Sequence, residues 1–137
     1  MTYTAALTML AMLVTPSSVS ADPTATAAAQ TNIYAGYSKA GYASRSGSRW
    51  NVYADYSKVG YVKRSGDRWN VYEGYSKIGY VKRSGSQWRI YEGYSKIGYV
   101  KRSGDRHNVY ENYSKVGYAK GANGGPVAGA ALLLAIV

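Results

Sequence analysis

The chain has 137 residues, no cysteine, 16 tyrosines and a formal net charge of +10. A chain of this length has room for one domain with a modest core, and the absence of cysteine excludes a disulfide framework and a thiolate metal site. All 17 Lys and Arg residues but only six of the seven acids lie in residues 31–120, so this segment carries +11 and favours an anionic partner. The alternative is that the basic residues only keep an open sheet soluble and unaggregated.

The amino-terminal residues predict an export signal followed by a spacer. Residues 5–14 form an apolar run of signal-peptide length, and the small residues Val19 and Ala21 suit cleavage after Ala21. We therefore expect a helical signal peptide over residues 1–21 and a secreted or cell-envelope location. No Lys or Arg precedes the apolar run, which leaves an ordinary apolar helix as the alternative. Residues 22–33 are rich in Ala and Thr and are expected to be a flexible linker.

A 19-residue phrase is repeated through residues 34–120. Its copies begin at Tyr34, Tyr53, Tyr72, Tyr91 and Tyr110, and the last copy is incomplete. A fixed period of this kind indicates a small supersecondary unit that must pack against its neighbours. It also argues against catalysis, because an active site is normally unique. We therefore expect no enzymatic activity and no cofactor.

Each copy of the phrase predicts two short β-strands. Residues 69–72 and 78–82 are rich in aromatic and β-branched side chains, and each run is followed by residues typical of turns. The fold class that we expect is all-β, a meander of about ten strands made of tandem β-hairpins. The sequence leaves open whether this meander closes radially.

The turn at Arg-Ser-Gly decides which side chains face the core. We favour a three-residue loop with a left-handed glycine. That register places four residues on one face: Val59, Tyr61, Trp69 and Val71. A two-residue Ser-Gly loop groups a different set: Gly60, Val62, Trp69 and Val71. The two sets differ because a one-residue slip exchanges the two faces of a strand.

The tryptophans recur at one place in successive copies and are predicted to be core residues. They are Trp50, Trp69 and Trp88. His107 takes the same place in the next copy. A ligand or a proton switch is one interpretation of His107, but a lone His in a structural position is more often a tolerated substitution.

The carboxyl-terminal segment breaks the repeat. Residues 121–126 are a Gly-rich turn, and residues 127–137 form an uninterrupted apolar strip. The strip has about half of the roughly 20 residues that cross a bilayer as a helix, so we expect no transmembrane anchor. We expect the strip to pack against the repeats.

The repeated polar residues do not suggest catalytic or metal chemistry. Five Tyr-Ser-Lys triplets could be read as Ser-Lys nucleophiles, but adjacent residues on a strand point to opposite faces. One His and no Cys leave no transition-metal site. We therefore expect neither catalytic residues nor metal ligands.

The run from Trp69 to Val81, Trp-Asn-Val-Tyr-Glu-Gly-Tyr-Ser-Lys-Ile-Gly-Tyr-Val, resembles the bacterial beta-flower repeats, written Trp-x-Val-Tyr-Asp-x-x-Gly-Lys-x-Val-Gly-x-Val. This resemblance covers residues 34–137 and implies short hairpins arranged radially. The run from Gly60 to Tyr72 is more weakly similar to choline-binding cell-wall repeats, in which rings cage a quaternary amine. The positive charge of this chain would repel choline, so the sites of that family are not transferred.

We expect an exported, non-enzymatic module that is structural or binds an anionic cell-envelope polymer or glycan, with weak sites adding avidity along the array. The candidate binding residues are Lys63, Arg64, Lys82, Arg83, Lys101 and Arg102, with Tyr56, Tyr75 and Tyr94 at turns. The alternative is a basic, aromatic nucleic-acid-binding protein, since residues 77–82 resemble an RNA-recognition strand signature. The sequence predicts no oligomeric state.

Overall fold

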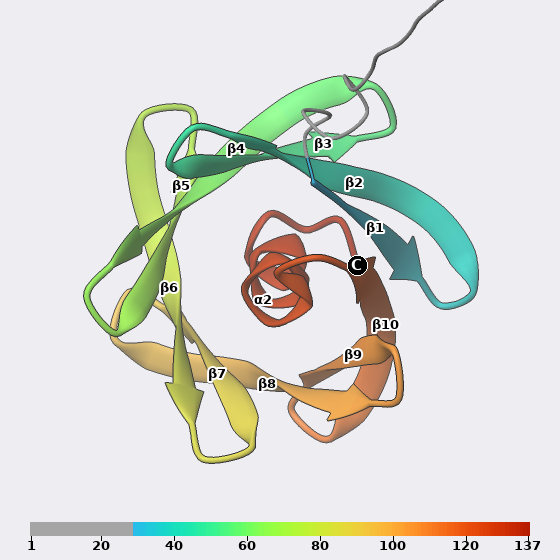
Figure 1. The fold of residues 1–137 in the computed structure, drawn as a ribbon. Helices are drawn as coiled ribbons and strands as arrows, with labels where there is room; N and C mark the ends of the chain where they lie inside the picture. Colours follow the sequence, from blue (N-terminus) through green and yellow to red (C-terminus); the bar gives the residue numbers. More distant parts are fainter. Residues whose placement is uncertain (1–28) are drawn as a thin grey trace, which may run out of the picture.

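A computed structural model describes residues 29–137, which form a closed antiparallel barrel of ten strands around one central helix (Figure 1). The strands are β1 (Gln30–Ala35), β2 (Ser38–Ser46), β3 (Arg49–Ala54), β4 (Ser57–Ser65), β5 (Arg68–Glu73), β6 (Ser76–Ser84), β7 (Gln87–Glu92), β8 (Ser95–Ser103), β9 (Arg106–Glu111) and β10 (Ser114–Gly121). Consecutive strands pair, and β10 returns to pair with β1. The all-β, tandem-hairpin prediction is confirmed, and the barrel closes. The predicted signal peptide lies outside the described residues.

The structure moves the start of the first repeat. Residues 30–33 were expected to belong to a linker, but they form the first part of β1, so this expectation is wrong. Each 19-residue unit contributes a six-residue strand and a longer one of eight or nine residues, and the first unit begins at Gln30. The repeat pattern is weaker in the first strand, because Thr31 stands where later copies have Trp.

The favoured strand register is also wrong. Val62 pairs with Val71, and Tyr61 pairs with Tyr72 on the outer face. The faces are therefore those of the two-residue alternative, but its Ser-Gly loop is not formed, since such a loop would pair Val62 with Trp69. The turn itself consists of Gly66 and Asp67. Gly66 has φ +65°, and a two-residue hairpin loop requires such a positive φ at its first central residue.

Each long strand has a β-bulge near its first residues, at the end away from the Gly-Asp type of turn. In β4, Lys58 pairs with Tyr53 and Gly60 pairs with Val52, so Val59 is an extra residue. A bulge shifts the alternation of side chains along a strand. Val59 therefore packs against the core, while Lys58 and Tyr61 both lie on the outer face.

The barrel wall supplies one layer of the core. Its inner face is lined by aliphatic side chains with no exposed surface: Ile33, Val52, Val62, Val71, Val81, Ile90, Val100 and Val109. Among the tryptophans, Trp50 is buried as predicted, whereas Trp69 and Trp88 pack against the core but stay partly exposed.

Helix α2 (Gly124–Leu133) supplies the other layer, and Figure 1 shows it along the barrel axis. Small residues let the helix approach the wall. A Cβ built at Gly129 would lie 2.5 Å from Cγ2 of Val81, and one built at Gly125 would overlap the indole of Trp88. The glycines of the helix therefore allow it to pack directly against the wall.

Leucine side chains near the end of the chain occupy the space that glycines of the wall leave open. Side-chain carbons of three consecutive leucines lie 3.0 Å from where a Cβ would stand on a glycine of three successive repeats. The pairs are Leu132 with Gly98, Leu133 with Gly79, and Leu134 with Gly60. Successive helical residues point about 100° apart, so neighbouring leucines reach neighbouring hairpins.

His107 lies where the chain turns into the helix. It takes the tryptophan position of β9, and a Cβ added at Gly124 would overlap its imidazole ring. Its Nδ1 is buried without a hydrogen-bond partner. Burial, with a smaller effect of the nearby charge of Arg102, lowers the pKa of His107.

We predict that Gly129→Ala destabilises the protein by about 1–3 kcal/mol, because the added methyl group meets Val81 in a filled core. Helix propensity alone would give the opposite sign, since Ala stabilises a helix relative to Gly. Urea denaturation measures the change. In a Gly129→Ala, Val81→Ala double variant the two costs should be less than additive, and full additivity would show that the contact is not the cause.

We predict that the free energy of unfolding falls as the pH is lowered through about 6.5. The unfolded chain takes up a proton at His107 near that pH, whereas the folded state resists it because the pKa is lowered. The contribution is thus complete above pH 6.5 and lost below it. Urea denaturation between about pH 7.5 and pH 5 measures the slope. An equal slope in His107→Gln would contradict this assignment.

Candidate functional site

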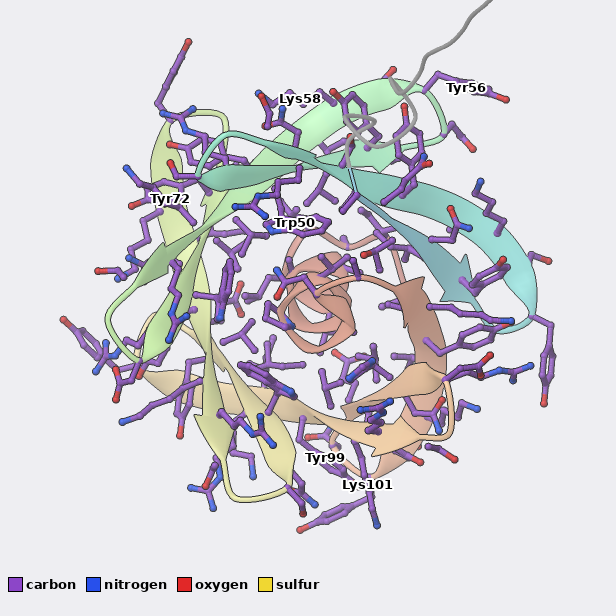
Figure 2. The ribbon with its side chains drawn as sticks, viewed as in Figure 1. Trp50, Tyr56, Lys58, Tyr72, Tyr99 and Lys101 are labelled. Atoms are coloured by element: carbon purple, nitrogen blue, oxygen red, sulfur yellow. The ribbon has the colours of Figure 1, made fainter. Side chains whose placement is uncertain are left out.

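The hairpin turns lie in two sets at opposite ends of the barrel. We call one end the tyrosine rim; its turns are residues 36–37, 55–56, 74–75, 93–94 and 112–113. We call the other end the basic rim; its turns are residues 47–48, 66–67, 85–86 and 104–105, with residues 121–123 leading into α2. The second residue of every tyrosine-rim turn is a tyrosine with 85–95% of its surface exposed. Tyr56, one of these, extends away from the wall in Figure 2.

The structure separates the predicted binding residues into two groups. The lysines and arginines, which are Lys63, Arg64, Lys82, Arg83, Lys101 and Arg102, lie in the half of the wall toward the basic rim. Tyr56, Tyr75 and Tyr94 lie at the tyrosine rim. A nine-residue strand such as β4 joins the rims, and it spans about 30 Å at the usual rise per residue. These residues therefore do not form one site.

The charge follows the same division. Three arginines, Arg49, Arg68 and Arg106, share a tyrosine ring with a lysine of the tyrosine rim and are counted with that rim. Nine of the 17 cations and two acids, Asp67 and Asp105, then lie toward the basic rim, which gives that half +7. Five lysines, these three arginines and four acids lie toward the tyrosine rim, which gives +4. The described barrel is thus more positively charged toward the basic rim than toward the tyrosine rim.

Five similar grooves open between neighbouring hairpins at the tyrosine rim, with volumes of about 180 to 350 Å³. Each is lined by the lysine of a Tyr-Ser-Lys triplet, by the two residues that follow it and by a turn of the adjacent hairpin. The lysines are Lys39, Lys58, Lys77, Lys96 and Lys115. A ring of nearly equivalent sites results.

The groove at Lys58 shows how the side chains are held. Tyr61 stacks on Tyr72 of the next strand, with ring centroids 4.6 Å apart. The Arg49 guanidinium lies 4.3 Å from the centroid of Tyr61, and the Lys58 ammonium lies 5.8 Å from it. The ring attracts both cations and keeps them at the groove, opposite the exposed ring of Tyr75. Figure 2 labels Lys58 and Tyr72 on this wall.

The five grooves are not identical. The groove at Lys77 also has two cations, because Arg68 lies 4.2 Å from the centroid of Tyr80. In the next repeat Gln87 replaces this arginine, and the groove at Lys96 has the lysine as its lining cation. Asp55 lines the groove at Lys39. Beside Lys115, Arg106 lies 4.3 Å from the centroid of Tyr118. The grooves at Lys58, Lys77 and Lys115 are therefore the best suited to an anion.

Sequence reasoning missed the groove lysines and their arginines. In a regular strand Lys58 and Tyr61, three residues apart, would point to opposite faces. The bulge at Val59 brings them to the same face. The available signal was Gly60, since a glycine inside a strand pattern often marks a bulge.

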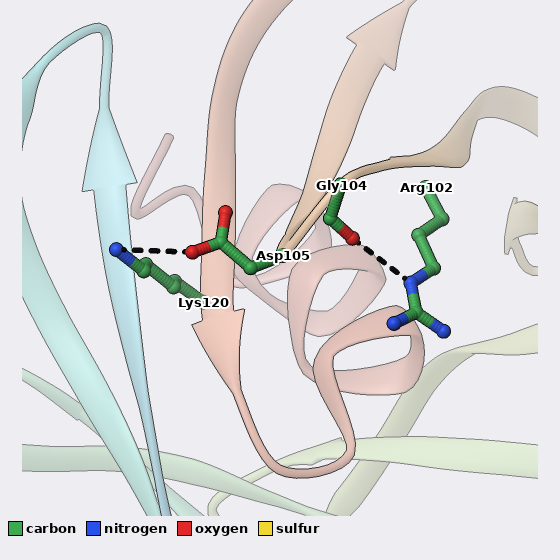
Figure 3. A network of polar contacts seen from close by, with 4 residues as sticks. All are labelled: Arg102, Gly104, Asp105 and Lys120. Atoms are coloured by element: carbon green, nitrogen blue, oxygen red, sulfur yellow. Dashed lines mark hydrogen bonds and ion pairs between the residues drawn. The ribbon is translucent and has the colours of Figure 1, made fainter.

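At the basic rim, arginines are fixed by their own turns. The Nε of Arg64 donates a hydrogen bond to the carbonyl oxygen of Gly66 at 3.2 Å. The same bond is made by Arg45, Arg83 and Arg102. Figure 3 shows the last of these beside the Asp105–Lys120 ion pair, whose N···O distance is 3.3 Å. The hydrogen bond and charge of Lys120 lower the pKa of Asp105.

No family model, curated protein or solved structure matches this chain. Within residues 29–137 no group of three or more His, Cys, Asp or Glu side chains is arranged to hold a metal ion. In the same part of the chain, no helix combines the length and apolarity needed to span a bilayer.

Proposed function

We propose that this protein is an exported, non-enzymatic binding module, and that it holds an anionic glycan polymer of the cell envelope in the grooves at the tyrosine rim. The observation that carries this proposal is the fivefold recurrence of one groove with a lysine and an exposed tyrosine. Repetition suits a polymer whose units also repeat. We also propose that the chain is related to the beta-flower repeats, which the run from Trp69 to Val81 resembles.

The chemistry of the groove fits an anionic sugar. The exposed ring of Tyr75 offers an apolar face and a hydroxyl, which suits a ligand with both C–H surface and hydroxyl groups. Lys58 and Arg49 offer charge-assisted hydrogen bonds to a carboxylate or phosphate. One groove makes few contacts, so affinity depends on several grooves binding one chain.

The separation of the two rims favours this function over nucleic-acid binding. Single-stranded nucleic acid is held where a basic groove and exposed aromatic rings coincide. Here most of the positive charge lies at the rim opposite the exposed rings. The exposed rings share their own rim with four acids, and Tyr61 and Tyr80, which lie nearest to the groove cations, are 8% exposed and already stacked.

We predict that the triple variant Tyr56→Ala, Tyr75→Ala, Tyr94→Ala binds immobilised alginate, a linear carboxylated glycan, at least about 10-fold more weakly than the parent. Each lost ring contact is worth roughly 0.5–1.5 kcal/mol, and avidity multiplies the losses. The parent should not be retained on neutral dextran. Affinity chromatography and surface plasmon resonance measure both effects.

Two matched controls accompany this experiment. The Tyr→Phe variant at the same three positions keeps the rings and should retain most of the binding. The variant Arg64→Gln, Arg83→Gln, Arg102→Gln, at the other rim, should also bind alginate. Unchanged alginate binding by the Tyr→Ala variant would overturn the groove proposal. Stronger binding to single-stranded DNA, with a steep dependence on salt, would favour the nucleic-acid alternative.

We predict that the mature protein begins at Asp22, because Ala21 completes a signal-peptidase site. Amino-terminal sequencing of the protein from its native host measures this. Recovery of a chain that begins at Met1 would remove export from the proposal while leaving the grooves to be tested by the glycan experiment.

A further inference from the structure

We propose that the basic rim is a second binding surface, which docks the barrel end-on against a lipid bilayer that carries anionic headgroups. This inference concerns the end of the barrel opposite the grooves and does not depend on the proposed glycan binding. It starts from the separation of charge. The half of the barrel toward this rim holds +7 of the +11 carried by the repeats, and its four turn arginines lie at the hairpin tips.

The acids of this half do little to oppose an anionic surface. Among the described residues they are Asp67 and Asp105, and each is already paired with a lysine. Asp67 lies 3.5 Å from Nζ of Lys82, and Asp105 lies 3.3 Å from Nζ of Lys120. The two acids therefore neutralise lysines on the wall and leave the turn arginines to set the charge of the rim.

The turn arginines are held in an orientation that suits the binding of phosphate groups. Arg45, Arg64, Arg83 and Arg102 each bond through Nε to a carbonyl of their own turn, so the guanidinium is held in place before any ligand arrives. The bond uses one of the five N–H donors, and the terminal nitrogens can donate to phosphate oxygens. Less rotamer freedom is then lost when the rim binds.

The arrangement of these arginines favours a surface over a strand of nucleic acid. They stand at four hairpin tips at one end of a closed barrel, so they can meet headgroups of one plane together. A single strand would need a continuous basic track with rings for its bases. The large apolar side chains that are exposed among the described residues, Tyr37, Tyr56, Tyr75, Tyr94 and Tyr113, all lie at the other rim.

The test measures co-sedimentation of the full chain with phosphatidylcholine vesicles that contain or lack phosphatidylglycerol. We expect binding to the anionic vesicles at about 0.1 M salt and release at about 0.5 M, where exposed charges are screened. The variant Arg64→Gln, Arg83→Gln, Arg102→Gln should bind on the order of 100-fold more weakly, because each basic residue near an anionic bilayer contributes about a fivefold effect.

The matched control is Lys58→Gln, Lys77→Gln, Lys96→Gln, which removes the same charge from the tyrosine rim and should bind the vesicles nearly as the parent does. An Arg→Lys variant at the three rim positions keeps the charge and should restore most of the binding. Circular dichroism melting confirms that each variant is folded.

Several results would overturn this inference. One is an equal loss of vesicle binding in the Arg→Gln and Lys→Gln variants, which would mean that only the overall charge of the protein matters. Another is equal binding to neutral and anionic vesicles. A third is tighter binding of the rim to duplex or single-stranded DNA than to anionic vesicles at the same salt concentration, which would assign the rim to a different partner. Loss of alginate binding in the tyrosine variants has no bearing on this result.

Discussion

The structure depends on filling the interior of a ten-stranded barrel. Eight strands enclose a space that wall side chains can fill, and a larger ring leaves room along its axis. Helix α2 occupies this room, and its glycines let it approach Val81 and Trp88 closely. The leucines at its carboxyl-terminal end contact the glycines of successive hairpins. Each wall repeat therefore packs both against its neighbours and against a segment that is not itself a repeat.

The same constraint directs the proposed binding to the outer surface. The helix takes up the inner face of the wall, so the repeated polar residues are displayed outside, at the two rims. Bulges such as the one at Val59 bring a lysine and a tyrosine to one groove, and stacked tyrosine pairs stiffen the wall beside it. The fivefold repetition then turns one modest groove into a multivalent ring.

Part of this site could be read from the sequence. The exposed turn tyrosines and the basic residues were recognised because they recur at fixed positions. Their separation was not, since Tyr56 and Arg64 are close along the chain but stand at opposite ends of β4. The partnership of Lys58 with Tyr61 was also hidden, because it depends on a bulge that reverses the expected alternation.

The sequence by itself determined the period, the two strands of each repeat, the all-β class and the inward side of Trp69 and Val71, because these follow from local composition and alternation. Only the tertiary structure decided the register, which depends on Gly66 being the first residue of a two-residue turn and which a one-residue slip would invert. It also decided closure, since β1 and β10 pair across almost the whole described chain. The apolar strip became a central helix for the same reason: apolar on all sides, it gains its stability from the wall that surrounds it.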